Sequence, residues 1–284
     1  VAAGFPCTAL SQAGRTAGIK GEASGLVHHV VRLLKAAARR RVSPTWLVIE
    51  NVPNMLQLDQ GHAMRYLVAQ LQEAKMRWAY RVVDSRFTGV PQRRRRVILV
   101  ASRTEDPAAV LFADEAGPRP DETYIDDAFG FYWTEGLRGL GWAQDATPTL
   151  KGGSTVGIPS PPAIWVPQAE VGHKLVNPGI EDAEELQGFP RGWTRAAASD
   201  ERRNGPRWKL VGNAVTADVA RWLGRRLAAP GDWTESGELW SGPRSWPTAA
   251  YGWGCRATPR CSSRLRPCSA RLRWCFPRAS TPAR

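Results

Sequence analysis

Apolar residues recur at two spacings in the first hundred positions of the chain, and each spacing predicts a different element. Residues 62–77 have apolar positions three or four apart and predict a helix with one buried face. Short, mostly apolar runs at residues 46–50, 80–84 and 97–101 predict short buried strands. Alternating helices and strands indicate an α/β protein with a doubly wound sheet. Residues 22–41 predict a further helix, whose inward positions are Leu26, Val30, Leu33, Leu34 and Ala37.

The pattern changes in the middle of the chain and then returns. Residues 104–180 are rich in Gly, Pro, Thr and Trp and have few long periodic runs, which predicts a loop-rich second domain. Helical spacing reappears at residues 183–186 and 214–227. We therefore expect a first domain made of residues 1–103 and 181–231, with residues 104–180 as a separate, smaller domain.

Composition changes again after about Gly231. Residues 240–284 hold nine Arg and no Lys, Asp or Glu. Neither helical nor strand periodicity continues there, so we expect residues 232–284 to form a disordered basic tail. Four of the five cysteines lie in this segment without the closely spaced pair that is typical of zinc sites, so no metal site is expected: Cys255, Cys261, Cys268 and Cys275.

The charge balance suggests a partner. The 284 residues carry a net charge of +13, and 39 residues are Lys or Arg, most of them Arg. An arginine-rich surface suits phosphate, which favours nucleic acid as the partner, although a GC-rich coding sequence would give the same bias. No window approaches 18 uninterrupted apolar residues, and the first residues lack the pattern of a signal peptide. We therefore expect a cytoplasmic protein without a membrane span.

Two segments carry candidate chemistry. Cys7 follows Gly4-Phe5-Pro6 and precedes a small loop that contains glycine, a placement that exposes the thiol to backbone N–H groups and favours the nucleophilic thiolate. Taken alone, such a cysteine is more often an inert part of a core. Glu50 ends a predicted buried strand, where open α/β sheets place their ligands. A carboxyl group there can hold or donate a proton to a bound ring nitrogen, whereas most isolated Glu residues do no more than cap a helix.

A third segment is an arginine run that leads into a predicted strand. Residues 93–96 are all Arg and follow Gly89-Val90-Pro91-Gln92. Alternation along a strand would place Arg94 and Arg96 on one face and Arg93 and Arg95 on the other. One pair could then address the active site or a phosphate. As a bare basic run, the segment would be a solvated face or a phosphate patch.

These three segments, together with two later ones, resemble the C5-cytosine DNA methyltransferase family of bacterial restriction–modification systems. The resemblance covers about residues 1–228, and its segments occur in the family's order. They are Gly4-Phe5-Pro6-Cys7-x-x-x-Ser11, Glu50-Asn51-Val52, Gln92-Arg93-Arg94-x-Arg96, Leu186-Gln187-Gly188-Phe189-Pro190 and Gly212-Asn213-Ala214-Val215.

The resemblance implies a fold and a reaction. The fold would be the Rossmann-like α/β sheet of S-adenosylmethionine-dependent methyltransferases, with residues 104–180 as a loop-rich target-recognition domain. The Cys7 thiolate would attack C6 of a cytosine flipped out of double-stranded DNA, while Glu50 holds the N3/N4 edge of the base. C5 would then accept the methyl group of S-adenosylmethionine. Arg94 and Arg96 would help to hold the flipped nucleotide and to order the catalytic loop.

The resemblance also assigns binding residues, none of them to a metal. Those toward the cofactor are Pro6, Asn213 and Ala214. Those toward DNA are Ser11, Gln12, Gln92, Thr149 and Lys151, and the last two stand in a Thr-Leu segment followed by Gly152-Gly153. A Gly/Pro surface loop without a role in DNA binding remains the alternative for that segment.

One part of the family pattern is missing. The family normally begins with a strand and a Phe-x-Gly-x-Gly loop for the cofactor, but only three residues precede Gly4. We therefore expect an N-terminally truncated enzyme whose sheet lacks its first strands, with weak or absent binding of S-adenosylmethionine by this chain alone. The apolar faces of residues 46–49 and 97–100 would be exposed.

Three other interpretations stay open. The chain could be an inactive DNA-binding fragment, or one half of a split methyltransferase that needs a separate cofactor-binding segment or subunit. It could also be a tRNA cytosine methyltransferase of the same fold. Phe5 before Pro6-Cys7 and the long Gly/Thr-rich insert fit the DNA branch better.

Overall fold

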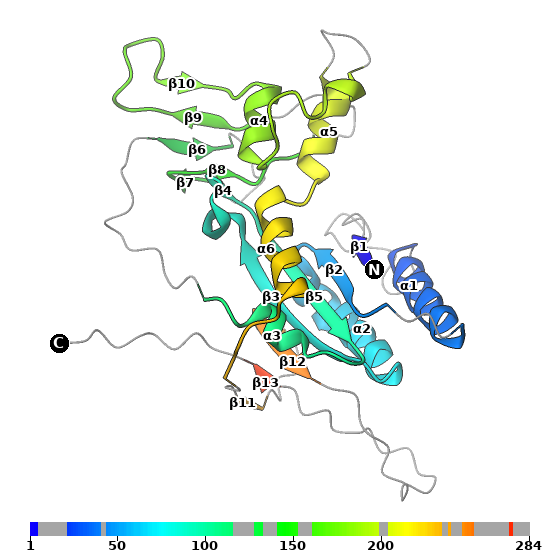
Figure 1. The fold of residues 1–284 in the computed structure, drawn as a ribbon. Helices are drawn as coiled ribbons and strands as arrows, with labels where there is room; N and C mark the ends of the chain where they lie inside the picture. The colour runs from blue at the N-terminus through cyan, green and yellow to red at the C-terminus, as the bar shows by residue number, and fades with distance from the viewer. Residues whose placement is uncertain are drawn as a thin grey trace, which may run out of the picture. The chain divides into compact units, whose positions relative to one another are not determined.

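The computed structural model describes most of the chain and divides it into two compact units (Figure 1). Unit 1 comprises residues 1–82, 96–115 and 225–284, and unit 2 comprises residues 83–95 and 116–224. No helix in the described part of the chain has the length and hydropathy that crossing a membrane requires. The described residues are 1–4, 22–40, 44–115, 128–132, 141–152, 161–198, 204–234, 238–239, 246–252 and 273–274.

Unit 1 is built on a mixed sheet. β2 is parallel to β1 and antiparallel to β5, and β12 is antiparallel to β3. The predicted strands are therefore present, but the sheet is not purely parallel. Within the described residues the sheet has seven strands, in the order β1 (Ala2–Gly4), β2 (Leu47–Asn51), β5 (Arg95–Ser102), β3 (Arg77–Asp84), β12 (Ala249–Gly252), β13 (Arg273–Trp274) and β11 (Glu238–Leu239).

The helices of unit 1 follow the predicted periodicity except at Leu33, which was expected to face inward but is 63% exposed, whereas the neighbouring Val31 is buried. Helix α1 (Glu22–Arg39) ends two residues before the expected boundary, and α2 (His62–Glu73) ends earlier than expected. The chain leaves α2 through Lys75, whose φ of 57° is left-handed, and β3 then begins at Arg77. A short helix, α3 (Pro107–Leu111), follows β5, and its N-cap Asp106 accepts a hydrogen bond from the backbone N–H of Ala108.

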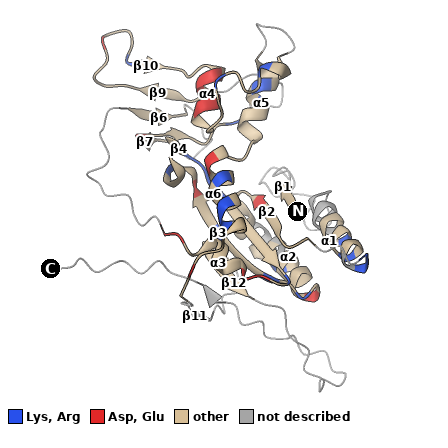
Figure 2. Ribbon diagram, viewed as in Figure 1, with Lys and Arg blue, Asp and Glu red and all other residues tan. Residues whose placement is uncertain are grey.

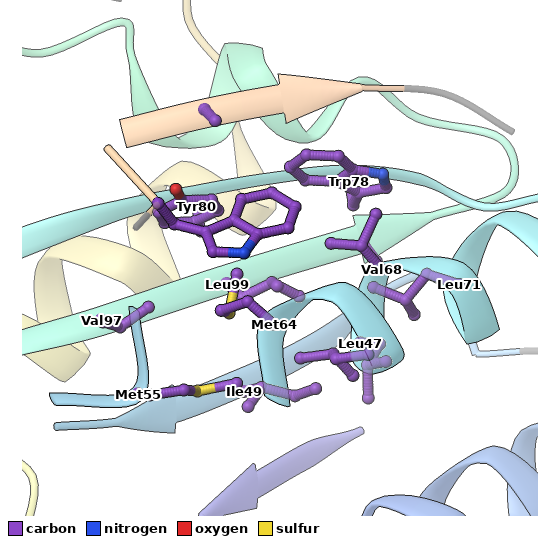
Figure 3. Packing of buried hydrophobic residues seen from close by; sticks show 14 of the residues in the cluster. Leu47, Ile49, Met55, Met64, Val68, Leu71, Trp78, Tyr80, Val97 and Leu99 are labelled. Atoms are coloured by element: carbon purple, nitrogen blue, oxygen red, sulfur yellow. The ribbon is translucent and has the colours of Figure 1, made fainter. Parts of the chain in front are cut away.

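The core of unit 1 lies between the sheet and α2 (Figure 3). Leu47 and Ile49 on β2 are 0% and 1% exposed, and residues 97–100 on β5 are at most 1% exposed. The expectation that these apolar strands would be exposed is therefore wrong. Side chains of α2 cover their inward-facing positions, and burial of a large apolar side chain contributes about 1.5–3 kcal/mol. The α2 residues in this cluster are Met64, Leu67, Val68 and Leu71.

Part of the expected tail completes the same core. Trp246 is 5% exposed, and its indole ring contacts Trp78 and Tyr80 edge-on, with ring centroids 6.2 Å apart in both pairs. Its Nε1 donates a hydrogen bond to the Gly61 carbonyl oxygen, and β12 then pairs with β3. Residues 246–252 are thus part of the sheet and core, and the expectation of a disordered tail is wrong there. A strand of four residues is too short for a periodic pattern to show in the sequence.

Unit 2 contains two small sheets and the later helices. A four-stranded sheet has the order β10 (Leu175–Val176), β9 (Ala163–Trp165), β6 (Phe129–Phe131) and β7 (Ala143–Gln144). A two-stranded parallel sheet joins β4 (Gln92–Arg93) to β8 (Thr147–Pro148). The helices are α4 (Ile180–Leu186), α5 (Gly205–Asn213) and α6 (Ala217–Ala228), of which α6 continues past the boundary at Gly224.

The division into units differs from the expected domain boundaries. Residues 83–95 and 181–224 group with residues 116–180, although the sequence pattern assigned them to the first domain. Polar contacts of residues 83–95 accompany this grouping. The side chains of Gln92 and Arg94 form hydrogen bonds with residues that come much later in the chain, and these bonds lie within unit 2.

Candidate active site

Glu50 lies beside the carboxyl end of β1 in unit 1. Strands β1 and β2 are parallel, and Gly4 is opposite Glu50 in their register. A Cβ atom built on Gly4 would lie 3.9 Å from Oε2 of Glu50. Parallel strands end at the same edge of a sheet, so the carboxylate stands where the chain of the predicted nucleophile motif leaves β1. Four predicted site residues lie outside the described residues: Pro6, Cys7, Ser11 and Gln12.

Arg96 holds the Glu50 carboxylate from the neighbouring strand. Its Nε is 3.0 Å from Oε1 of Glu50, and the two side chains are 16% and 20% exposed, respectively. The register of the antiparallel β2–β5 pair explains this contact. Glu50 is opposite Ile98, and Arg96, two residues before Ile98 on β5, lies diagonally across from Glu50 on the same face of the sheet. Partial exclusion of water strengthens such a pair compared with a surface ion pair. Two of the predicted catalytic residues are thus brought together.

A buried amide lies next to this ion pair in the sequence. Asn51 is 1% exposed, and its Oδ1 accepts a hydrogen bond of 2.8 Å from the backbone N–H of Val52. Its Nδ2 has no hydrogen-bond acceptor within the part of the chain that the structure describes. Leaving a buried donor unpaired costs about 1–3 kcal/mol. The end of β2 is therefore a polar position within an otherwise apolar sheet.

Arg94 does not lie on a strand face with Arg96. Strand β4 ends at Arg93 and β5 begins at Arg95, so the alternation that we expected is interrupted at Arg94. The Arg94 side chain is 2% exposed and lies in unit 2. Its guanidinium group donates hydrogen bonds to three backbone carbonyl oxygens, those of Leu150, Gly212 and Ala214. The guanidinium group is thus engaged within the protein, and its contact with a flipped nucleotide stays a prediction.

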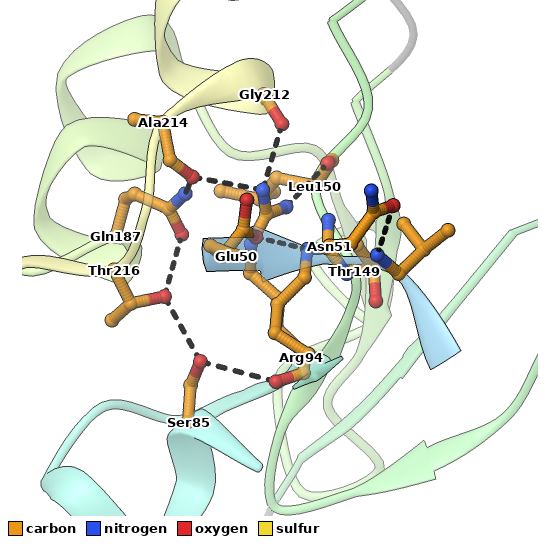
Figure 4. A network of polar contacts seen from close by, with 12 residues as sticks. Glu50, Asn51, Ser85, Arg94, Thr149, Leu150, Gln187, Gly212, Ala214 and Thr216 are labelled. Carbon is orange, nitrogen blue, oxygen red and sulfur yellow. Dashed lines mark hydrogen bonds and ion pairs between the residues drawn. The ribbon is translucent and has the colours of Figure 1, made fainter. Parts of the chain in front are cut away.

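Gln92 is buried beside the same Leu150 segment, near Arg94 and Gln187, which Figure 4 shows. Its Oε1 accepts a hydrogen bond from the backbone N–H of Leu150, and its Nε2 donates to the Leu186 carbonyl oxygen and to Oε1 of Gln187. Both ends of the amide are thus bonded within the protein, and the side chain is 0% exposed. The amide of Gln92 is thus occupied by protein partners in this structure, and its contact with DNA stays a prediction.

The two predicted DNA-binding residues of the Thr-Leu segment, Thr149 and Lys151, differ in their surroundings. The hydroxyl group of Thr149 donates a hydrogen bond of 2.9 Å to the Arg93 carbonyl oxygen, so it fixes the segment in place. Lys151 is exposed, and its Nζ lies 4.0 Å from the centroid of the Tyr132 ring. A cation over an aromatic face is held in a defined position while it stays accessible to solvent. Of Thr149 and Lys151, only Lys151 therefore presents a charged group to solvent, where it is accessible to a phosphate.

The predicted cofactor residues lie where Arg94 makes its contacts, because Arg94 donates hydrogen bonds to the carbonyl oxygens of Gly212 and Ala214. Asn213 is exposed at the end of α5, and Ala214 is half-buried. The preceding Gly212 is packed so closely that a Cβ atom would lie 2.2 Å from the backbone nitrogen of Gly152. The structure therefore places the predicted cofactor segment against the predicted DNA segment.

Gln187 is a buried polar residue to which the sequence analysis gave no role of its own. It is 0% exposed, and its Nε2 donates hydrogen bonds to the carbonyl oxygens of Val211 and Ala214. Its Oε1 accepts from Gln92 and from the hydroxyl group of Thr216. A signal was available, because Gln187 stands inside the Leu186–Pro190 motif between apolar residues. A glutamine that is buried at the end of a helix needs hydrogen-bond partners for both the oxygen and the nitrogen of its amide.

Glu184 organises the loop that follows. The ribbon of α4 is largely in the colour of acidic residues in Figure 2. Among these residues, Glu184 is 0% exposed and accepts hydrogen bonds from both the backbone and hydroxyl groups of Thr194. Arg207 donates to the same carboxylate at 3.0 Å, and the Gly192 N–H also donates. Burial raises the pKa of Glu184, but the hydrogen bonds from Thr194, Arg207 and Gly192 outweigh it, so the pKa is below its ordinary value. Glu184 is thus a buried anion with all its charge compensated locally.

Solved structures and sequence relatives agree on the kind of protein. A methyltransferase structure from S. pombe, titled Dnmt2, superposes with a TM-score of 0.53 at 14% identity, over 81% of this chain and 78% of that one. The Entamoeba histolytica methyltransferase EhMeth gives a TM-score of 0.51 at 15% identity, over 80% and 77%. These two likenesses show the α/β fold of methyltransferases.

The family follows from sequence. Residues 1–130 match the family described as C-5 cytosine-specific DNA methylase. The chain is 48% identical over 265 residues to the Type II methyltransferase M2.BsuMI of Bacillus subtilis (strain 168). The aligned region covers 89% of this chain and 66% of that protein. It is 23% identical to the Type II methyltransferase M.MspI of Moraxella sp, over 80% of this chain and 55% of that protein. The chain belongs to the C-5 cytosine-specific DNA methylase family.

Proposed function

We propose that the protein is a cytoplasmic DNA (cytosine-5-)-methyltransferase of a restriction–modification system. It transfers a methyl group from S-adenosylmethionine to C5 of a cytosine in double-stranded DNA. The observation that carries the proposal is the Glu50–Arg96 pair beside the end of β1, where the Gly4-Phe5-Pro6-Cys7 motif continues. The 48% identity to a Type II methyltransferase supports the same reaction.

The proposed chemistry begins with Cys7. Its thiolate attacks C6 of the flipped cytosine, and the electron pair of the C5–C6 double bond moves toward C5 and the ring. Glu50 holds the N3/N4 edge and stabilises the charge that develops there. Arg96 keeps the Glu50 carboxylate oriented through the 3.0 Å contact. Once C5 carries the methyl group that the bound cofactor would supply, removal of the C5 proton and departure of Cys7 restore the aromatic ring. Flipping the base out of the duplex costs a few kcal/mol.

The cofactor side is assigned to the end of α5. The bound cofactor supplies the methyl group. Asn213 presents an exposed amide at this position, which fits the polar amino-acid end of S-adenosylmethionine, and Ala214 follows with a small side chain that leaves room. On the DNA side, the exposed ammonium group of Lys151 suits a phosphate contact.

The test is methyl transfer from labelled S-adenosylmethionine to cytosine-containing duplex DNA, run beside a Cys7→Ser variant. We expect transfer with the wild type and none with the variant, because a hydroxyl group is a far weaker nucleophile than a thiolate. Transfer to tRNA in place of duplex DNA would contradict the proposed substrate. Salt-sensitive DNA binding without transfer by the wild type would contradict the proposed activity and support a DNA-binding fragment or half of a split enzyme.

A further inference from the structure

Two segments far apart in the sequence are joined by one buried set of polar side chains in unit 2. We name it the Gln92–Arg94–Gln187 cluster after its members (Figure 4). Toward residues 149–152, Gln92 accepts from the Leu150 N–H at 3.1 Å, and Arg94 donates to the Leu150 carbonyl oxygen at 3.3 Å. Toward residues 212–214, Arg94 donates to the Ala214 carbonyl oxygen at 2.8 Å, and Gln187 donates to the same oxygen at 2.7 Å. The 2.5 Å contact between Gln92 and Gln187 closes the connection.

Backbone packing joins the same two segments. A Cβ atom on Gly212 would lie 2.2 Å from the nitrogen of Gly152 and 2.4 Å from the carbonyl carbon of Lys151. Glycine at position 212 therefore lets two backbones touch directly. A Cβ atom on Gly152 would lie 3.3 Å from Oδ1 of Asn213, so the contact extends to the residue that we assign to the cofactor.

The cluster makes independent movement of the two segments costly. Gln92 and Gln187 are both 0% exposed and Arg94 is 2% exposed, so water cannot replace a bond that breaks. An unmade hydrogen bond of a buried group costs about 1–3 kcal/mol, and more when the group is charged. A shift of residues 149–152 would break the bonds of Leu150 with both Gln92 and Arg94, unless residues 212–214 shifted as well.

We propose that Gln92, Arg94 and Gln187 are positioning residues that couple DNA contact at residues 149–152 to the conformation of residues 212–214. This inference rests on the proposed function, which assigns Lys151 to DNA and Asn213 to the cofactor. Neither surface residue is part of the buried bridge, but each is adjacent in sequence to a backbone group that the bridge holds. Coupling of this kind is reciprocal, so DNA and cofactor strengthen each other's binding through the cluster.

Hydrogen exchange of the full chain tests the coupling without requiring turnover. The amides of residues 208–216 are followed with and without a mixed-sequence, cytosine-containing duplex, and DNA binding is measured separately by fluorescence anisotropy. We expect DNA to slow exchange of this segment about fivefold or more in the wild type. In Arg94→Lys, which loses the branched guanidinium group, we expect no slowing while DNA affinity stays close to wild type. Gln187→Met removes the bonds to Val211 and Ala214 and serves as a second variant, should Arg94→Lys not fold.

Arg86→Lys is the matched control. Arg86 also lies in unit 2 and donates to the Asp84 carboxylate, but it makes no bond in the Gln92–Arg94–Gln187 cluster. We expect it to keep the DNA-dependent slowing. Equal slowing in Arg94→Lys and wild type would overturn the inference, because it would show direct contact of DNA with residues 208–216. DNA binding without any slowing in the wild type would also overturn it. Absence of DNA binding would instead overturn the proposed function, and the inference with it.

Discussion

Arg96 and Glu50 face each other across neighbouring strands of one sheet, with 3.0 Å between Nε of the arginine and Oε1 of the carboxylate. Both side chains are mostly removed from solvent, at 16% and 20% exposure. The guanidinium group therefore fixes the direction of the carboxylate, as positioning a catalytic acid or base requires. The pair also compensates the charge of Glu50 at the edge of an apolar sheet.

Replacing Glu50 tests its part in the chemistry. We expect Glu50→Gln to lower kcat for methyl transfer by about 10²–10⁴-fold, the usual contribution of a positioned proton-transfer group. DNA affinity should change little, because the amide keeps the size of the carboxyl group. Single-turnover transfer and anisotropy measure the two quantities. Glu73→Gln is the control, since Glu73 is 60% exposed and, among the residues that the structure describes, forms a surface ion pair with Lys35. A kcat for Glu50→Gln within about tenfold of wild type would contradict the assigned role.

The buried pair in α4 and α5 gives a stability prediction. Glu184 is 0% exposed and Arg207 is 8% exposed at their side chains, and their contact is 3.0 Å. We expect Glu184→Gln to lower the free energy of unfolding of unit 2 by about 3–5 kcal/mol, because it leaves the buried Arg207 charge without an opposite charge beside it. Urea denaturation measures the change. Glu185→Gln is the matched control on the same helix: its side chain and that of its partner Arg191 are 52% and 51% exposed, so a change below about 1 kcal/mol is expected.

The same carboxylate predicts a dependence of stability on pH. The pKa of Glu184 in the folded protein lies below its ordinary value of 4.5, since the hydrogen bonds to the carboxylate outweigh the effect of burial. Its stabilisation is therefore complete above pH 4.5 and is lost as the pH falls through the folded-state pKa. We expect the difference in unfolding free energy between wild type and Glu184→Gln to shrink as the solution is acidified below that value. A difference that stays constant, or grows, under acid would argue against an ionised Glu184.

Two glycines in neighbouring helices should respond oppositely to alanine. Gly212→Ala places a Cβ atom 2.2 Å from the Gly152 nitrogen, so backbone must move and unit 2 should lose about 1–3 kcal/mol of stability. Gly224→Ala, on α6, meets nothing within 4 Å and should gain about 0.5–1 kcal/mol from helix propensity. Thermal melting of the two variants beside wild type checks the signs. Equal effects would mean that the close contact at Gly212 is not present in solution.

Trp246 tests whether the late segment belongs to the core. We expect Trp246→Ala to destabilise unit 1 by about 3–5 kcal/mol, as for other large-to-small changes of buried aromatic residues. Trp193→Ala is the matched control, because Trp193 is 64% exposed and its loss removes little buried area. Denaturant titration followed by circular dichroism compares them. If both changes had the same small effect, residues 246–252 would not be packed against β3 as the structure shows.

Local pattern predicted the elements of unit 1 well but not their partners. Residues 22–41 showed a helical period and residues 97–101 a continuous apolar run, and Glu50 was expected at a strand end. Its pairing with Arg96 depends on the register between two strands, which periodicity does not report. Helix α5 was missed because Gly205-Pro206 at its start and Gly212 near its end lower helix propensity.

The buried cluster could not be predicted for a different reason. Arg94 was expected to face the active site because strand alternation placed it on one face with Arg96 and the family resemblance gave both that role. It is buried nonetheless, since three carbonyl oxygens from distant residues accept its hydrogen bonds. Such a set of acceptors is assembled only by the tertiary fold. Sequence motifs marked the participating segments correctly, yet they gave no indication that Gln92 and Gln187 contact each other.

The pairing of β12 with β3 determines when unit 1 can finish folding during translation. Strand β3 is translated early, whereas the residues that cover its edge and fill the space beside Trp78 and Tyr80 are translated long after it. A nascent chain therefore carries an unpaired edge and an uncovered aromatic cluster while the whole of unit 2 is synthesised. Contacts over such a distance in sequence also form slowly. Unit 1 can thus complete its folding only after unit 2 has been translated, although most of its sheet comes first.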